Sequence, residues 1–188
     1  MIISIGGGAG SGKSTVAKKL AEKLNWPRYY IGKIRREIAK KQGLTLAEYN
    51  KVGEKDPATD LEVDKYQKKI GQTKDNFIIE GRTSWYFIPH SLKIYIDVDE
   101  KVGAQRVFKE LKGRNSRNED KNLETMKDVL KSQQVRKISD KKRYKKYYQI
   151  DVYNKKNYDF ILDTTGLNKS QVFSKIYDFV KSNLNKKN

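Results

Sequence analysis

The sequence lacks cysteine, holds a single histidine and contains no hydrophobic run long enough to span a membrane. Without cysteine, neither disulfide bonds nor thiolate metal sites can form. We interpret the histidine, His90, as a solvated loop side chain, because it directly follows Pro89. The N-terminus also lacks the basic flank and long apolar segment of a secretory signal. We therefore expect a soluble, cytoplasmic protein, and its 188 residues suit one domain with a full hydrophobic core.

Acidic residues are scarce as well, with 23 against 41 lysines and arginines, which gives a formal net charge of +18 at pH 7. A chain this basic is suited to a polyanionic partner such as RNA. The lysines are nevertheless spread along the whole chain and form no basic arm. We therefore do not favour nucleic-acid binding, since a basic surface also steers small nucleotides toward a site.

The N-terminal stretch MIISIGGGAGSGKST places a glycine-rich loop between an apolar strand and an amphipathic helix. Residues 7–14 match the P-loop pattern GxxxxGK followed by Ser or Thr, without a mismatch. Small residues let successive backbone N–H groups point into one concavity at a helix N-terminus, where a polyphosphate binds. Lys13 is predicted to reach the β- and γ-phosphates, and the Ser14 hydroxyl is predicted to ligate Mg²⁺. The residues predicted to bind the nucleotide here are Gly7, Gly8, Ala9, Gly10, Ser11, Gly12, Lys13, Ser14 and Thr15.

Five short apolar runs predict strands, at residues 2–5, 28–31, 76–80, 93–98 and 158–163. Helical patterns separate most of them, which is typical of a parallel sheet covered on both faces. We expect an α/β fold with three layers, α/β/α, and a five-stranded parallel sheet, forming one P-loop domain over residues 1–188. Two polar stretches of helical pattern interrupt the alternation, at about 32–72 and about 113–141.

This layout narrows the class of P-loop protein. A small GTPase would need DxxG and a later NKxD; DTTG at residues 163–166 fits the first pattern, but NKxD is missing from the sequence. Motor and helicase-like ATPases need a longer chain. A compact P-loop kinase remains, in which the first insert binds the acceptor and the second closes over the donor as a lid.

Five segments carry a resemblance to a known family: IGGGAGSGKSTVAKKLAEKL, GKIRREIAKKQGLTLAEYNKVGEKDPATDLEVDKYQ, IIEGR, VRKISDKKRYKKYYQID and YDFILDTT. Through them the chain resembles the small nucleoside monophosphate kinases over nearly its whole length, and most closely the archaeal-type cytidylate kinases. The resemblance implies transfer of the γ-phosphate of ATP, with Mg²⁺, to CMP or dCMP. We expect a monomer whose partners are these nucleotides. The residue pattern itself predicts a kinase, and only the resemblance points to cytosine.

The acceptor of such a kinase is an ionised phosphate, so no general base is needed and catalysis depends on neutralising and aligning two polyanions. This chemistry predicts several arginines converging on one point, because a planar guanidinium holds phosphate with two hydrogen bonds. By the resemblance, Arg36 and Arg82 bind the acceptor phosphate. Arg136 and Arg143 lie seven residues apart on one helix face, with Asp140 between them. The resemblance implies that both reach the transferred phosphoryl group.

Carboxylates complete the predicted site. Asp60 and Asp64 lie four residues apart on one helix face and are predicted to face the sugar or base of the acceptor. Glu80 and Asp97 end the third and fourth strands, where they are candidates for holding Mg²⁺ through water. By the resemblance, the turn that packs beside the adenine of the donor lies at Thr165 and Gly166.

Some positions depart from the family pattern and leave the acceptor base open. Similar kinases carry an acid and then an aromatic where this chain has Lys33 and Ile34, and their closing segment is shorter, with an arginine beside its glycine. Arg114 and Arg117 are displaced candidates for that arginine.

Two other kinds of function therefore stay open. One is a P-loop kinase of another monophosphate, or of the 5′-hydroxyl of a nucleoside or RNA, which would need a carboxylate base. The other is an RNA-binding assembly ATPase that resembles adenylate kinase and depends strongly on salt.

Overall fold

Five parallel strands form the centre of the computed structural model, which describes residues 1–113, 120–121 and 123–186. Their order across the sheet is β2-β3-β1-β4-β5. The five-stranded parallel sheet expected from the apolar runs is therefore confirmed. The strands are β1 (Ile2–Gly7), β2 (Arg28–Tyr30), β3 (Phe77–Glu80), β4 (Leu92–Asp97) and β5 (Phe160–Asp163).

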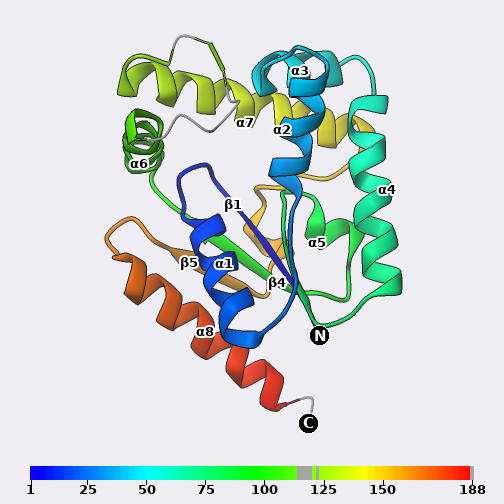
Figure 1. Ribbon diagram of the computed structural model, residues 1–188, viewed down its shortest axis with the longest axis vertical. Helices are drawn as coiled ribbons and strands as arrows, with labels where there is room; N and C mark the ends of the chain where they lie inside the picture. Colours follow the sequence, from blue (N-terminus) through cyan, green and yellow to red (C-terminus); the bar gives the residue numbers. More distant parts are fainter. Residues whose placement is uncertain (114–119, 122, 187–188) are drawn as a thin grey trace.

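Helices connect the strands and surround the sheet (Figure 1). They are α1 (Lys13–Leu24), α2 (Ile31–Lys41), α3 (Leu46–Gly53), α4 (Ala58–Thr73), α5 (Ser84–Phe87), α6 (Glu100–Gly113), α7 (Met126–Tyr148), the short 3-10 turn η1 (Lys155–Asn157) and α8 (Lys169–Asn185). The helices α3, α7 and α8 each begin with a capping box. In this motif the first side chain and the one three residues later bond each other's backbone N–H groups, which fixes where the helix starts.

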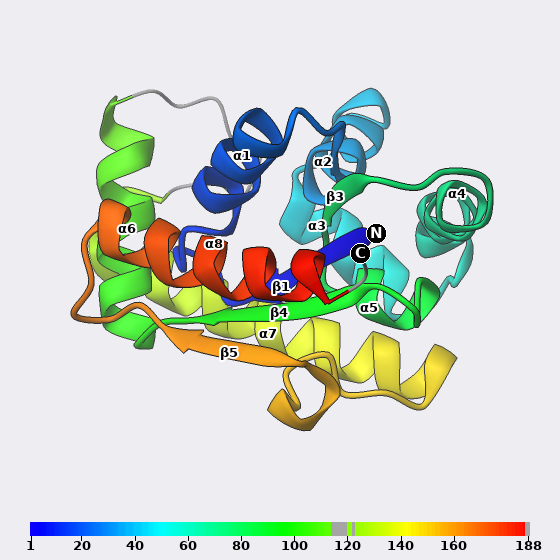
Figure 2. The ribbon, with the colours of Figure 1, turned by 90° about the horizontal axis from the view of Figure 1, so that it is seen from below.

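The central strand β1 is buried along its whole length and contributes to two hydrophobic cores, one on each face of the sheet. Successive strand side chains point to opposite faces, so Ile3 and Ile5 enter one core and Ile2 enters the other. Side chains of α1 and α8 cover the first core, and these two helices lie on the same face of the sheet in Figure 2. The second core packs against α4 and the segment that follows α5. The three layers expected from the sequence are thus present.

The carboxyl ends of the strands face the helices of the two predicted inserts. The first insert, at about 32–72, consists of most of α2 with α3 and most of α4. The second, at about 113–141, starts where α6 ends and continues into α7, which lies across the carboxyl edge of the sheet beside α3 and α6 (Figure 1). The assignment of these inserts to acceptor binding and closure stays a prediction.

Strand boundaries differ from the expected ones by one or two residues. β1 continues through Gly7 because its last two residues still pair with β4, and β5 begins only at Phe160. Among the described residues, no helix combines the length and the apolar composition needed to cross a membrane.

Candidate active site

A cavity of about 860 Å³ lies at the carboxyl edge of the sheet. Its walls come from the glycine-rich loop, from α2 and α4, from the segment after β3, and from α6, α7 and the start of α8. Open α/β sheets bind their ligands at this edge, and the volume is that of a typical small-molecule site. The fold therefore brings both predicted inserts to the same cavity as the glycine-rich loop.

The glycine-rich loop passes along one wall of this cavity. Residues 9–15 line it, whereas Gly7 and Gly8 lie outside the lining. Gly7 has a φ of 134°, and a Cβ there would lie 2.0 Å from the carbonyl oxygen of Ile96. A Cβ on Gly10, whose φ is 73°, would lie 2.2 Å from the carbonyl oxygen of Gly103 on α6. Glycine is required at both positions because the loop is packed tightly between β4 and α6.

The Lys13 side chain folds back over the loop from the first turn of α1. Its ammonium group donates a hydrogen bond to the carbonyl oxygen of Gly8 and lies 3.4 Å from the Ser11 hydroxyl. Lys13 also lines the cavity. The side chain is thus placed where phosphate oxygens bound to the loop could take over these contacts.

Ser14 and Glu80 form a pair of oxygen donors beside the loop. The Ser14 hydroxyl donates to Glu80 Oε2 over 2.7 Å, and both residues line the cavity. Glu80 is 2% exposed, and Arg28 Nε donates to its other oxygen over 2.7 Å. A hydroxyl next to a carboxylate fits Mg²⁺, which prefers oxygen ligands and keeps several waters. Within the described part of the chain, no cluster of three or more metal-binding side chains occurs, so nucleotide phosphates and water would complete such a site.

The other predicted Mg²⁺ residue, Asp97, does not line this cavity. Its Oδ2 lies 2.5 Å from the Lys155 ammonium, and its Oδ1 accepts the N–H of Val98. The expectation that Asp97 holds Mg²⁺ beside Glu80 is therefore not supported by its position, because Lys155 already neutralises the carboxylate.

The predicted adenine turn also lies just outside the lining. The Thr165 hydroxyl accepts the N–H of Asp99 and donates to Asp163, and neither Thr165 nor Gly166 lines the cavity. The next residues, 167–169 at the start of α8, do line it. The place of the donor base thus stays a prediction, displaced by one to three residues from the expected turn.

Three of the four predicted arginines line the cavity, from three separate elements: Arg36 on α2, Arg82 after β3 and Arg136 on α7. Arg36 NH1 donates to the Gly32 carbonyl oxygen over 2.8 Å and to the Tyr30 hydroxyl over 3.1 Å. Arginines from three elements therefore border one cavity, and their convergence on one phosphoryl group stays a prediction.

Arg82 is held by residues far away in the sequence. Its Nε lies 2.8 Å from Asp140 Oδ2 and 3.1 Å from the Tyr153 hydroxyl. The Tyr153 hydroxyl in turn donates to the same Asp140 oxygen over 2.9 Å. Burial favours the neutral form of Asp140, but Arg82, Arg143 and Arg136 outweigh that effect and lower the pKa of Asp140 to about 2. Asp140 therefore stays ionised and anchors the guanidinium of Arg82 at the cavity wall.

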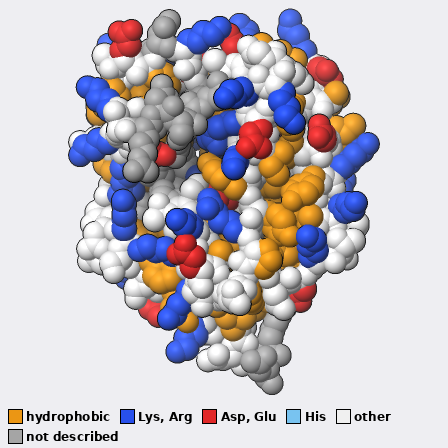
Figure 3. All heavy atoms as spheres, viewed as in Figure 1, with side chains coloured by type: hydrophobic (Ala, Val, Ile, Leu, Met, Phe, Trp, Pro, Cys, Tyr) orange, Lys and Arg blue, Asp and Glu red, His pale blue; other side chains and the backbone are white. Residues whose placement is uncertain are grey.

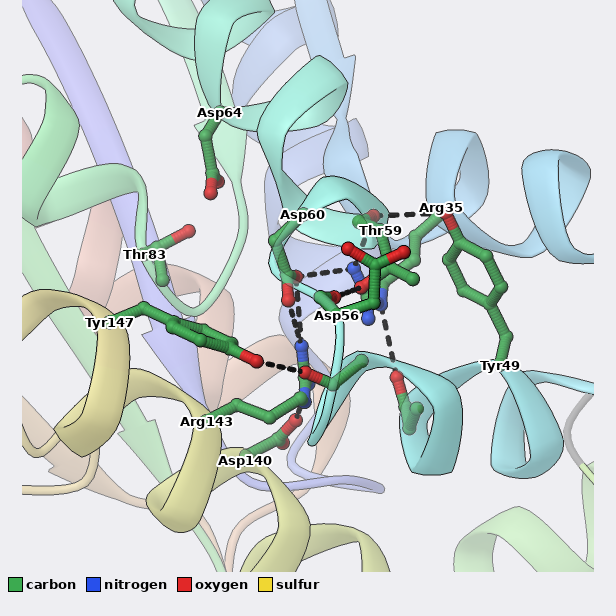
Figure 4. A network of polar contacts seen from close by, with 12 residues as sticks. Arg35, Tyr49, Asp56, Thr59, Asp60, Asp64, Thr83, Asp140, Arg143 and Tyr147 are labelled. Carbon is green, nitrogen blue, oxygen red and sulfur yellow. Dashed lines mark hydrogen bonds and ion pairs between the residues drawn. The ribbon is translucent and has the colours of Figure 1, made fainter.

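Arg143 is placed differently from the expectation that it reaches the transferred phosphoryl group. It is 1% exposed and does not line the cavity. Its NH1 donates to both oxygens of Asp60, over 2.8 and 2.6 Å, and its NH2 donates to Asp140 over 2.6 Å (Figure 4). Buried charges must be paired, and this pairing fixes α7 to α4. Arg143 is therefore a positioning residue in this structure.

Asp60 and Asp64 both line the cavity from α4 but in different surroundings, and their predicted contact with the sugar or base of the acceptor stays a prediction. Asp60 is shared by Arg143 and by Arg35, whose Nε donates to Asn50 over 3.0 Å. Asp64 has no arginine partner among its hydrogen bonds in the described residues: it accepts from Gln67 and from the Tyr148 hydroxyl. Burial, with the nearby charge of Asp60 adding to it, raises the pKa of Asp64 to about 7.

Sequence reasoning missed other residues of the site. Arg106 on α6 lines the cavity and donates to the Thr164 carbonyl oxygen over 2.7 Å and to the Thr164 hydroxyl over 3.1 Å. Arg35 was missed as well, because a charged residue on a polar helix carries no signal that it is buried. Thr83 was also missed, but a sequence signal could have found it, since it directly follows the EGR segment. The candidates Arg114 and Arg117 lie outside the described residues.

On the face seen in Figure 3, Lys and Arg side chains lie at many separate places, with hydrophobic and uncharged areas between them. This spread agrees with the expectation from the sequence that the lysines form no single basic region.

Comparisons with known proteins agree with this geometry. A family model described as the cytidylate kinase-like family matches residues 2–166. A cytidylate kinase from Methanosphaera stadtmanae is 35% identical over 168 residues, covering 89% of this chain and 91% of the relative. A cytidylate kinase from Natronomonas pharaonis is 36% identical over 174 residues, covering 92% and 85%. The solved shikimate kinase of Bacteroides thetaiotaomicron shares the fold, with a TM-score of 0.63 at 13% identity over 98% of each chain.

Proposed function

The chain belongs to the cytidylate kinase-like family, and we propose that it transfers the γ-phosphate of ATP to CMP, giving ADP and CDP. The observation that carries this proposal is the placement of residues 9–15 of the P-loop and of three arginines around one cavity. We propose dCMP as a second acceptor. We also propose that the enzyme acts as a monomer, because a single chain supplies every element of the cavity.

In this reaction a phosphate oxygen of CMP attacks the γ-phosphorus, and the bond from that phosphorus to the β–γ bridging oxygen breaks. The acceptor is ionised at neutral pH, so none of the side chains has to remove a proton from it. Arg36 and Arg82 hold the acceptor phosphate, and Lys13 and Arg136 neutralise the charge that is spread over the transferred group. Ser14 and, through water, Glu80 would hold Mg²⁺, which offsets the charge of the β- and γ-phosphates.

A coupled assay of ADP release tests this function directly. The purified chain, with ATP and Mg²⁺, is given each nucleoside monophosphate in turn, cytidine, and a short RNA with a free 5′-hydroxyl. We expect the highest kcat/KM with CMP and little ADP release without an acceptor. Turnover only with a hydroxyl acceptor would overturn the proposal.

A second measurement distinguishes the proposed kinase from an RNA-binding ATPase. RNA binding by the same protein is titrated over a range of salt concentrations. We expect weak binding that falls with salt, as for any basic protein. Tight RNA binding together with ATP hydrolysis that CMP does not accelerate would favour an assembly factor instead.

A further inference from the structure

Asp64 belongs to a polar cluster that the transfer reaction does not use. The cluster consists of Asp64 and Gln67 on α4, Thr83 and Ser84 after β3, and Tyr148 at the end of α7. Gln67 Nε2 donates over 3.2 Å both to Asp64 Oδ1 and to the Thr83 hydroxyl, and Gln67 Oε1 accepts from Ser84 over 2.7 Å. Both donors of the Gln67 amide are thereby engaged, so its orientation is fixed. Asp64, Gln67 and Thr83 all line the cavity.

The fixed amide determines what the cluster offers to a ligand. Thr83 already accepts a hydrogen bond from Gln67, so its own hydroxyl hydrogen can be donated to the cavity. Each Asp64 oxygen has one bond and can accept another. Figure 4 shows the Asp64 and Thr83 side chains near one another. The wall therefore presents a carboxylate acceptor next to a hydroxyl donor, and Thr83 directly follows the phosphate-binding Arg82.

This arrangement complements one pyrimidine edge and opposes the other. Cytosine presents an amino donor at N4 beside an acceptor at N3, whereas uracil presents an acceptor at O4 beside a donor at N3. An ionised carboxylate accepts from the amino group but repels O4, and leaving a buried polar group unpaired is costly. We propose that Asp64 and Thr83, oriented by Gln67, bind the cytosine edge of the acceptor, and that the negative charge of Asp64 excludes uracil. This inference rests on the proposed function.

The charge of Asp64 is sensitive to pH because of what surrounds it. Burial raises its pKa to about 7, the hydrogen bond from Tyr148 on α7 opposes that rise, and Asp60 on α4 adds to it. The positive charges of Arg35 on α2 and Arg143 on α7 also lower this pKa. Between pH 6 and pH 8 the ionised fraction thus increases from about a tenth to about nine tenths. A protonated Asp64 can donate to O4 of uracil, so selectivity for cytosine must grow as the pH rises.

The test measures kcat/KM for CMP and for UMP at saturating ATP between pH 6 and pH 8. The phosphates of the two acceptors titrate alike and cancel from the ratio, and kcat/KM reports groups of the free enzyme. We expect the CMP/UMP ratio of the wild type to rise about ninefold or more. Asp64→Asn keeps the shape and cannot ionise, so its ratio should be at least about 10-fold lower at pH 8 and independent of pH. Glu62→Gln, an exposed carboxyl two residues earlier on α4, is the matched control and should behave as the wild type.

The outcomes distinguish this inference from the function on which it rests. A wild type that prefers CMP, with a ratio unchanged by Asp64→Asn, overturns the inference and leaves the proposed function standing. A wild type that phosphorylates neither pyrimidine overturns both. If thermal melts show that Asp64→Asn does not fold, the pH profile of the wild-type ratio decides, and a flat profile overturns the inference.

Discussion

The cavity wall that we assign to ATP, the donor wall, is made of backbone from one continuous segment, whereas the wall that we assign to CMP, the acceptor wall, is made of charged side chains from several elements. Residues 9–15 supply the donor wall between β1 and α1. The acceptor wall combines Arg36, Asp60, Asp64 and Arg82, from α2, α4 and the segment after β3. The first wall depends on glycines and a helix N-terminus, and the second depends on buried ion pairs that join distant segments.

The two walls differ in what holds their binding groups in place. A loop of backbone N–H groups needs few supporting side chains, because the main chain itself is the binding group. Arg82 of the acceptor wall needs a fixed partner, and a chain of alternating charges supplies it: Arg35, Asp60, Arg143, Asp140 and Arg82. Substitutions on the donor side should therefore change turnover alone, whereas substitutions within the ion-pair chain should also change stability.

The largest expected effect is that of Lys13→Ala. Removing this charge from the transferred phosphoryl group should lower kcat at least about 10³-fold. The melting temperature should stay close to that of the wild type, because the side chain lines the cavity and is not part of a hydrophobic core. Steady-state kinetics and a thermal melt measure the two effects, with the exposed Lys18→Ala on the same helix as control. Near-native turnover of Lys13→Ala with CMP would contradict the proposed mechanism.

Arg143→Met tests whether the chain of buried ion pairs contributes to stability. It removes one of the two arginine partners of Asp60 and one of those of Asp140, which keep Arg35 and Arg82, and should lower the free energy of unfolding by about 3–5 kcal/mol. The neighbouring Lys142→Met removes an exposed pair with Glu54 and should cost about 0–1 kcal/mol. Denaturant titration of both variants gives these values. A stable Arg143→Met protein with greatly reduced kcat would show instead that Arg143 acts on the phosphoryl group.

Arg82→Lys has the smallest expected effect. It tests both the binding of the acceptor phosphate by Arg82 and the ion pair of Arg82 with Asp140. The charge remains, but the two-pronged hydrogen bonding is lost, which should cost about 1.5–3 kcal/mol, or roughly 10- to 10²-fold in kcat/KM for CMP. The KM for ATP should hardly change, because the loop and Lys13 hold that substrate. Kinetics with varied CMP at saturating ATP, together with a melt, measure this. Normal acceptor kinetics would remove Arg82 from the site.

Local sequence was sufficient for the donor wall and the sheet. The P-loop is one continuous motif whose function lies in its backbone, so residues 7–14 could be recognised as a P-loop before any fold was known, and residues 9–15 do line the cavity. The alternation of short apolar runs and helical patterns likewise predicted five parallel strands, since neighbouring residues alone carry this pattern. The same reasoning could only place Arg36, Asp60, Asp64 and Arg82 near the site without their partners.

What only the tertiary structure decided is which charged side chains face the cavity and which are buried beneath its wall. Arg136 and Arg143 share one face of α7, yet they lie two turns apart along the helix. Arg136 borders the cavity, whereas Arg143 is buried between α7 and α4, where it pairs with Asp60 on α4 and with Asp140 on α7. The sequence by itself determined the P-loop, the parallel sheet and which arginines are available to the site. Their division into binding and positioning residues depends on contacts between segments up to 83 residues apart, and no local pattern encodes such contacts.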